Sequence, residues 1–393
     1  MMKTRIFTLL LFFSSFISAQ TNDYTISVLT IGPGTSLSDS FGHSAIRVQS
    51  KEKKYDLVFN YGVFDFNDPQ FYSNFIKGYL NYSLGVNYFK DFKSSYISNN
   101  RSIKEQVLQL PDKLKEKLVE KLIFNSQPEN KDYFYDYFLN NCTTIIKDHI
   151  NESLVQFDYR NNYNLLSKDK NSYRSLIYEN INKNSWGSLG IDICLGSYID
   201  QRIDPEKNTF LPEYLFEYLN YSYYNYSNID KVVEEIKLVK SIRFINKVKE
   251  IEKSRLNNSL TSPLFIFILI FTALFLLSYK NKKNKKIHLA LESIHILTTM
   301  IGFLLIFLWF FTDHSTAAFN YNLLWANPMN FILLISIINK KWKIAYLKLL
   351  LLSLVLIVLH SITEVQVFNI GLYPLFIFLA YRYIQLIKYY SKA

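Results

Sequence analysis

The stretch Asn140-Asn141-Cys142-Thr143-Thr144 decides how the rest of this 393-residue chain is interpreted. Asn is favoured at the N-cap of a helix, and the apolar residues Ile145, Ile146 and Ile150 follow at helical spacing. The sequence therefore predicts a helix with Cys142 in its first turn. The helix dipole and the first backbone N–H groups favour a thiolate there, and they also suit an oxyanion. This pattern predicts a nucleophilic cysteine.

A nucleophilic thiol needs a base, and the chain has six histidines. His149 follows Cys142 by seven residues, which is about 10 Å along a helix and beyond the roughly 3 Å reach of a hydrogen bond. His43 stands at the entrance of a predicted strand, after a polar loop, and we expect it to be the base. Its sequence separation from Cys142 is about a hundred residues, so only the fold can bring the two together.

A third side chain must orient the imidazole of the base. Asn60 on the next predicted strand is one candidate. Asp39 and Asn141 are the others, and the spacing of these residues does not separate the three.

Cys194, the second cysteine, has no helix start beside it, which favours a role as a small core residue. A disulfide with Cys142 is the alternative, because an exported compartment is oxidising. No pair of His or Cys residues has the spacing of a zinc site, so we expect neither a metal nor another cofactor.

The composition indicates that part of the chain lies in a membrane, since 49% of the residues are hydrophobic and 17% are aromatic. The net charge of +11 is unevenly distributed. Residues 20–260 hold 30 basic and 30 acidic residues, whereas residues 261–393 hold 12 basic against 3 acidic. The N-terminal part therefore has no basic excess for nucleic acid, and we exclude nucleic acid as a partner.

The termini of the chain predict export followed by membrane insertion. Residues 1–19 have a basic start, a short apolar run and Ala19 before a polar residue, which is typical of a signal peptide. Five apolar runs, separated by alternately basic and non-basic loops, predict five spans at 263–279, 289–311, 328–338, 344–360 and 369–387. By the positive-inside rule the basic loops are cytoplasmic, which places the first 260 residues outside the inner membrane.

The exported part predicts an α+β unit in residues 20–226. We expect strands at 24–31, 41–48, 55–61, 84–92 and 103–110, and helices at 68–79 and 111–124. The Asn-, Ser- and Tyr-rich residues 151–226 predict an irregular cover or lid. Apolar residues at helical spacing then predict an amphipathic connecting helix at 229–256, within a connecting segment 227–260 that leads to the membrane domain at 261–393.

Several motifs resemble those of one known family. They are Ser40-Phe41-Gly42-His43-Ser44-Ala45-Ile46-Arg47-Val48, Asn60-Tyr61-Gly62-Val63-Phe64-Asp65-Phe66 and Asn141-Cys142-Thr143-Thr144, followed by 195–200, 210–215, His314 and 320–328. Together they resemble the Lnb-type lipoprotein N-acyltransferases of Bacteroides-like bacteria. More distantly, His on a strand before Cys on a helix is similar to the circularly permuted NlpC/P60 thiol enzymes.

This resemblance implies a permuted papain/NlpC-P60-like α+β domain followed by an all-α transmembrane domain of about five helices. It implies transfer of a fatty acyl chain from a phospholipid donor to the N-terminal amine of a diacylated lipoprotein acceptor, at the membrane. Cys142 would carry the acyl group as a thioester, with His43 as base and Asn60 beside it. The side chains implied in substrate binding are Ser44, Asn141, His314, Asn320, Asn322 and Asn327.

Two alternatives use the same residues differently. The chain is a membrane-tethered cell-wall peptidase or amidase of the NlpC/P60 type, or it is a non-enzymatic membrane assembly factor in which Cys142 and Cys194 form a disulfide. For the outer loop that carries His314 and Asn322, the simpler interpretation is an ordinary polar connection between two spans.

Overall fold

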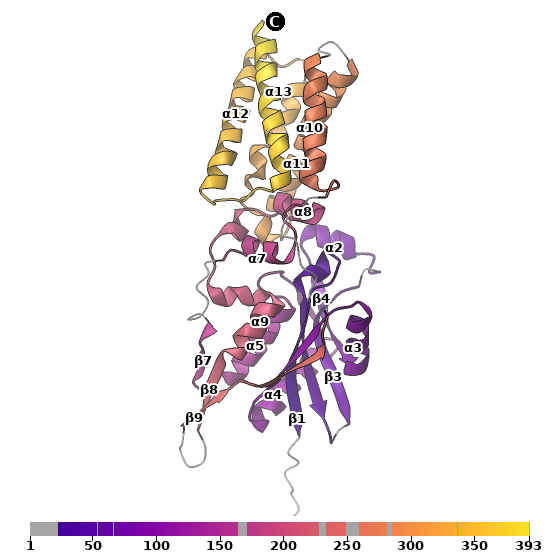
Figure 1. The fold of residues 1–393 in the computed structure, drawn as a ribbon, viewed down its shortest axis with the longest axis vertical. Coiled ribbons are helices and arrows are strands. Elements are labelled where there is room, and N and C mark those ends of the chain that lie inside the picture. Colours follow the sequence, from indigo (N-terminus) through magenta and orange to yellow (C-terminus); the bar gives the residue numbers. More distant parts are fainter. Residues whose placement is uncertain are drawn as a thin grey trace, which may run out of the picture.

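The computed structural model describes residues 23–52, 54–65, 67–163, 171–227, 233–248, 259–280, 285–335 and 337–392. An α+β domain and a bundle of long helices lie end to end along the longest axis (Figure 1). The predicted signal peptide at 1–19 lies outside the described residues.

A seven-stranded antiparallel sheet forms the centre of the α+β domain, in the order β10-β5-β1-β2-β3-β4-β6. The strands β1, β2, β3 and β5 lie where the sequence predicts them. The bounds are β1 (Tyr24–Ile31), β2 (His43–Ser50), β3 (Tyr55–Val63), β4 (Asn81–Tyr88), β5 (Ile103–Leu108), β6 (Asp132–Phe134) and β10 (Val239–Asn246).

Helices cover both faces of this sheet, because its central strands are apolar on both sides. In β1, Ile26 and Val28 pack in the same cluster as α4 (Asp112–Asn125) and α5 (Cys142–Leu154). Leu29 and Ile31 of the same strand pack instead in the cluster of α3 (Phe89–Ser98). The predicted strand at 84–92 is therefore wrong at its C-terminal end, where Phe89 and Phe92 lie three residues apart on one buried helical face.

The expected irregular cover at 151–226 is wrong, because most of its described residues are helical. Helices α7 (Tyr173–Asn180), α8 (Trp186–Cys194) and α9 (Pro212–Asn220) lie there, together with the short strands β7 (Tyr159–Asn161) and β8 (Ser222–Ser227). Serines that were taken as a loop signal begin two of these helices. Ser172 caps α7 and Ser185 caps α8, each in a reciprocal pair with the serine three residues later.

The predicted amphipathic helix at 229–256 is also wrong. Its described residues form β9 (Val233–Lys237), which pairs with β8, and β10, which pairs with β5 at the edge of the main sheet. Val and Ile are good strand formers, and an open sheet edge offered β10 backbone partners that a surface helix does not need. Residues 228–232 and 249–258 of this prediction lie outside the described residues.

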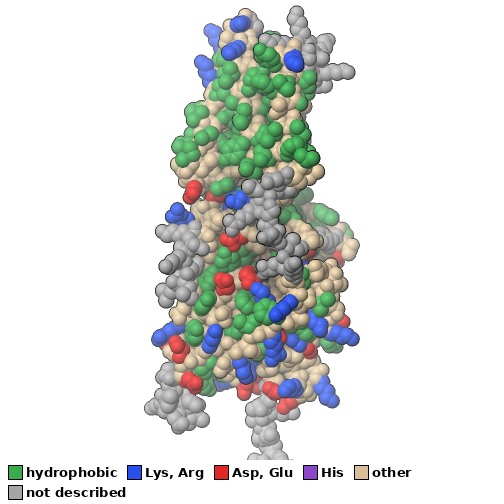
Figure 2. Space-filling model, in the orientation of Figure 1, with side chains coloured by type: hydrophobic (Ala, Val, Ile, Leu, Met, Phe, Trp, Pro, Cys, Tyr) green, Lys and Arg blue, Asp and Glu red, His purple; other side chains and the backbone are tan. Residues whose placement is uncertain are grey.

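Four helices are long and apolar enough to cross a membrane in the part of the chain that the structure describes. They are α10 (Pro263–Lys280), α11 (Lys285–Phe310), α12 (Lys340–Ile362) and α13 (Tyr373–Lys392). Hydrophobic side chains cover the visible face of this bundle, whereas charged side chains gather on the α+β domain and at the far end of the bundle (Figure 2). The α+β domain followed by a helical membrane region agrees with the predicted fold class.

The expected fifth helix, at 328–338, is instead the 3₁₀ helix η6 (Pro328–Leu334) followed by irregular chain. Asn330 is fully buried, where it donates to Thr298 Oγ1 of α11 at 2.9 Å and accepts from the Tyr346 hydroxyl of α12 at 2.8 Å. The chain thus runs between α11 and α12. A 3₁₀ helix rises about 2.0 Å per residue against 1.5 Å in an α-helix, so a short apolar segment reaches further this way. Non-helical backbone is tolerated at membrane depth where protein surrounds it.

Gly302 of α11 tests this packing, because a Cβ at Gly302 would lie 2.2 Å from the Ala326 carbonyl oxygen and 2.7 Å from Pro328 N. We expect Gly302→Ala to destabilise the protein by about 1–3 kcal/mol, the usual cost of overpacking. Thermal unfolding in detergent measures the effect. Gly190→Ala in α8 is the matched control, since no atom lies within 4 Å of its added Cβ. A melting temperature for Gly302→Ala at or above that of the wild type would contradict the packing described here.

Candidate active site

Asn141 fixes where α5 begins and therefore where the Cys142 thiol lies. Its side-chain oxygen accepts hydrogen bonds from the backbone N–H groups of Thr143 at 2.8 Å and Thr144 at 3.0 Å, and the Thr144 hydroxyl accepts from the Asn141 N–H. The Asn141 amide group donates to the carbonyl oxygens of Tyr137 and Phe210 at 2.9 Å each. These bonds confirm the predicted N-cap. They also occupy the buried side chain, so its predicted contact with substrate stays an untested prediction.

His43, Cys142 and Asn60 meet at the corner where β2 begins, β3 nears its end and α5 begins. His43 forms a hydrogen bond with Cys142, and its Nε2 lies 2.6 Å from Asn60 Oδ1. Because the amide oxygen only accepts, Nε2 carries a proton and the other ring nitrogen is left for the thiol. A thiol, an imidazole and an amide in this order form the nucleophile, base and orienting group of a thiol enzyme.

The two ionisable groups of this site change each other's pKa. Burial alone raises the pKa of the Cys142 thiol, but the His43 charge, the His43 hydrogen bond and the backbone N–H groups of Ser44 and Thr143 bring it below its usual 9.0. Burial alone lowers the pKa of His43, but the Cys142 charge and the hydrogen bonds to Cys142 and Asn60 raise it above its usual 6.5. Both shifts favour a thiolate–imidazolium pair.

Gly62 makes room for this pair. It has φ of +91°, and a Cβ built there would lie 3.9 Å from Cys142 Cβ, 4.0 Å from His43 Cε1 and 3.8 Å from Tyr135 Cε2. Glycine adopts this backbone conformation without strain, and it leaves the space in front of the thiol and imidazole open. The sequence motif contained Gly62, but its role was missed because it depends on the approach of α5.

The other sequence candidates for the base and its partner have different contacts. His149 Nε2 lies 2.9 Å from the Tyr61 hydroxyl in the core beneath α5. Asp39 forms an ion pair with Arg101 at 2.7 Å. Cys194 is a free thiol, as is Cys142, so the structure contradicts the disulfide alternative. Ser44 is fully buried and points its backbone N–H at the thiol, while its predicted contact with substrate stays untested.

The predicted substrate-binding residues of the outer loop lie where the two domains meet or within the bundle. Asn320 donates to the Ile193 carbonyl oxygen at 2.7 Å, and Asn322 donates to that of Asp192 at 2.8 Å, both at the end of α8. His314 Nε2–H donates to the Phe75 carbonyl oxygen at 3.0 Å in α2 (Phe71–Lys77). Asn327 accepts from the Met329 N–H and caps η6. The simpler interpretation of an ordinary polar connection is therefore incomplete, because this loop binds the α+β domain.

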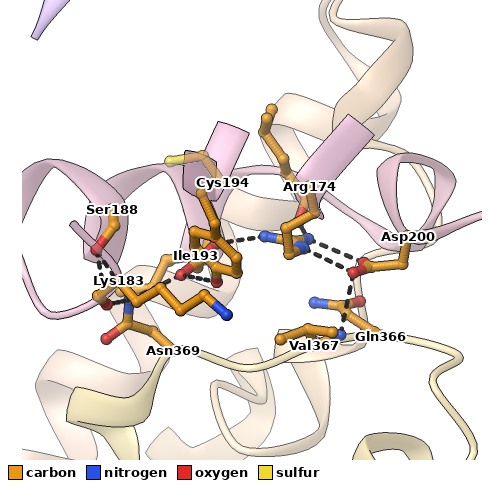
Figure 3. Close-up of polar contacts among 12 residues, drawn as sticks. Arg174, Lys183, Ser188, Ile193, Cys194, Asp200, Gln366, Val367 and Asn369 are labelled. Carbon is orange, nitrogen blue, oxygen red and sulfur yellow. Dashed lines mark hydrogen bonds and ion pairs between the residues drawn. The ribbon is translucent and has the colours of Figure 1, made fainter. Parts of the chain in front are cut away.

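A buried ionic network between the domains was missed by the sequence reasoning. Arg174 lies 2.5 Å from Asp192 and 2.7 Å from Asp200. Asn369, on the loop before α13, donates to Asp192 at 2.7 Å, and the neighbouring Val367 N–H donates to Asp200 at 3.3 Å (Figure 3). Removal of one partner from such a buried network costs about 3–5 kcal/mol, so the network fixes how the domains are joined. No sequence motif connects these residues.

Two family models match this chain in the same two parts. Residues 16–177 match the Lnb N-terminal periplasmic domain, and residues 255–393 match the Lnb transmembrane domain. The chain belongs to the Lnb family. No curated protein and no solved structure matches it. The Lnb family places the chain among membrane proteins that process lipoproteins, with the α+β part as the periplasmic domain and the helical bundle as the transmembrane domain.

The thiolate–imidazolium pair of this Lnb protein predicts a specific pH dependence of alkylation. Only the thiolate reacts with iodoacetamide, so Cys142 should remain reactive at pH values well below 9.0. In His43→Ala the charge and hydrogen bond that lower the thiol pKa are gone, and burial alone raises it. We expect alkylation of Cys142 at pH 7 to slow more than about tenfold in this variant. Mass spectrometry of the Cys142 peptide over a pH series measures the rate.

Cys194 is the control for this experiment within the same molecule, because burial raises the pKa of its thiol and no neighbouring cation is among the causes of its shift. Its alkylation should be slow at neutral pH in both proteins. Equal rates for Cys142 in the wild type and in His43→Ala would contradict the assignment of His43.

Proposed function

We propose that this chain transfers a fatty acyl group from a phospholipid to the N-terminal amine of a diacylated lipoprotein, through a thioester on Cys142. The observation that carries this proposal is the Cys142–His43–Asn60 site in an Lnb periplasmic domain joined to a transmembrane domain. Both substrates are held in a bilayer by their lipid chains. A membrane-joined thiol enzyme suits them.

In the first step, the Cys142 thiolate attacks the ester carbonyl carbon of the phospholipid. The C–S bond forms, and the carbonyl oxygen becomes an oxyanion that the N–H groups at the start of α5 are placed to stabilise. When the intermediate collapses, the ester C–O bond breaks, and the leaving alkoxide takes the proton of the His43 imidazolium. The products are a lysophospholipid and an acyl-thioester on Cys142.

In the second step, the lipoprotein's α-amine attacks the thioester. Neutral His43 takes a proton from the amine as the C–N bond forms, and the C–S bond then breaks. The products are an amide and the Cys142 thiolate beside a protonated His43, so the starting pair is restored.

The burial of the thiol supports transfer rather than hydrolysis. Cys142 is 9% exposed, and the rings of Tyr61, Tyr133 and Tyr135 lie on the strands and loop around the start of α5. A thioester in such a place is shielded from water, while an amine delivered with its lipid chains can still reach it. A cell-wall peptidase with the same residues needs water at this point and gains nothing from four apolar helices beyond an anchor.

Substitution of the catalytic pair in cells tests this proposal. We expect Cys142→Ala and His43→Ala to accumulate lipoproteins with two acyl chains and a free N-terminal amine, because neither variant forms the thioester. Mass spectrometry of N-terminal lipopeptides measures this. Cys194→Ala is the control and should keep three acyl chains. Unchanged triacylation in both variants, or cleavage of peptidoglycan peptides by purified protein that leaves a diacylated lipopeptide untouched, would refute the proposal.

Asn60 is proposed as a positioning residue that acts through His43. Asn60→Ala should lower kcat about 10- to 100-fold with little change in KM, since a misplaced imidazole affects the chemical steps rather than lipid binding. Asn60→Asp, which keeps an acceptor for Nε2–H, should recover part of the rate. An increase in KM alone, without a fall in kcat, would place Asn60 outside the catalytic arrangement. Steady-state assays with phospholipid and diacylated lipopeptide in detergent separate these outcomes.

A further inference from the structure

A continuous series of aromatic rings leads from the membrane domain to the catalytic thiol. The distances between ring centroids are 6.2 Å for Phe75–Phe71, 5.7 Å for Phe71–Phe64, 5.0 Å for Phe64–Tyr82 and 4.4 Å for Tyr82–Tyr135. We call these five residues the aromatic track. They come from α2, from β4 and from the loops after β3 and β6, so no single element contains the series.

The outer end of the aromatic track is fixed to the membrane domain. The Phe75 carbonyl oxygen accepts a hydrogen bond from His314 at 3.0 Å, and that of Lys77 accepts from the Asp313 N–H at 2.9 Å. These two loop residues follow α11 directly. At the end of that helix, Phe310 and Phe311 are 64% and 71% exposed, so the apolar surface of the bundle leads up to α2.

The inner end of the aromatic track lies beside the reacting groups. Tyr135 Cε2 is 3.8 Å from the position that a Cβ on Gly62 would occupy, and Cys142 Cβ is 3.9 Å from the same position. The absence of a side chain at Gly62 therefore leaves open space between the last ring of the track and the thiol.

The aromatic track and its flank are exposed, although they are apolar. Tyr72 and Ile76 of α2 are 64% and 52% exposed, and Phe75 is 41% exposed. Phe134, on the strand beside the track, is 64% exposed and lies 6.2 Å from Tyr79. A contiguous exposed apolar patch on a folded protein marks a binding surface. Figure 1 shows α2 at the end of the α+β domain nearest to the bundle, which is where lipid is available.

We propose that the aromatic track binds one acyl chain of the phospholipid donor and guides its ester to Cys142. This inference rests on the proposed function and adds the route and the binding surface of the donor. An acyl chain extends about 15 Å, half of the ~30 Å hydrocarbon core, and four ring-to-ring steps of 4.4–6.2 Å cover a comparable length. Flat aromatic faces offer such a chain a large contact area without any charge to desolvate.

The donor step alone tests this inference, without any lipoprotein acceptor. In the double variant Phe64→Ser/Phe75→Ser, acylation of Cys142 by a long-chain phospholipid in nanodiscs should slow at least about tenfold, since two large apolar contacts are lost. Acylation by p-nitrophenyl acetate should be unchanged, because its acetyl group is too short to contact the track. Intact-protein mass spectrometry follows the first reaction, and nitrophenol release follows the second.

Phe124→Ser is the matched control, since Phe124 is 63% exposed on α4, outside the aromatic track. It should leave both rates unchanged. Wild-type rates with both esters in the track variant, or an equal loss with both, would overturn the inference. If the wild-type protein itself is not acylated by phospholipid, the proposed function fails instead, so the two failures are distinguishable.

Discussion

The hydrogen bond between Cys142 and His43 is the interaction on which the rest of this structure depends. It requires the first turn of α5 to lie against the beginning of β2, and the N-cap of Asn141 fixes that first turn. It also requires the glycine at position 62, because a side chain there would fill the space in front of both groups. The buried pair favours charge separation, since each group stabilises the charged form of the other against the effect of burial. The antiparallel sheet and its two helical layers hold this one corner rigid.

A reactive thiol alone does not select lipid substrates, and the contact between the domains supplies that constraint. The Arg174–Asp192–Asp200 network and the loop residues Asn320 and Asn322 join the end of α8 to the membrane domain through buried polar contacts. Buried polar groups are costly to separate, so the site stays at one height relative to the bundle. The residues expected to bind substrate in this loop therefore hold the two domains together, and α2 brings apolar side chains to the same border.

Local sequence signals predicted the elements of the catalytic corner well. The alternation in 24–31 and 55–61, the Asn before Cys142 and the polar loop before His43 each reflect short-range physics that a neighbour does not change. The failures at 151–226, 229–256 and 328–338 share one cause. In each, the segment's structure depended on a partner from elsewhere: β5 offered an open edge to β10, and α11 and α12 enclosed η6. Apolar residues at intermediate spacing fit more than one structure until that partner is known.

The sequence by itself determined that this is an exported α+β domain followed by a membrane domain, with Cys142 at a helix start and His43 at a strand start. Charge partition, hydropathy and caps are sums over near neighbours, and they need no knowledge of the fold. Only the tertiary structure decided that Asn60 rather than Asp39 faces His43, that four long helices and one 3₁₀ segment form the bundle, and that five separate rings line up toward the thiol. Those facts are distances between residues far apart in the chain, and they exist only after packing has chosen one arrangement.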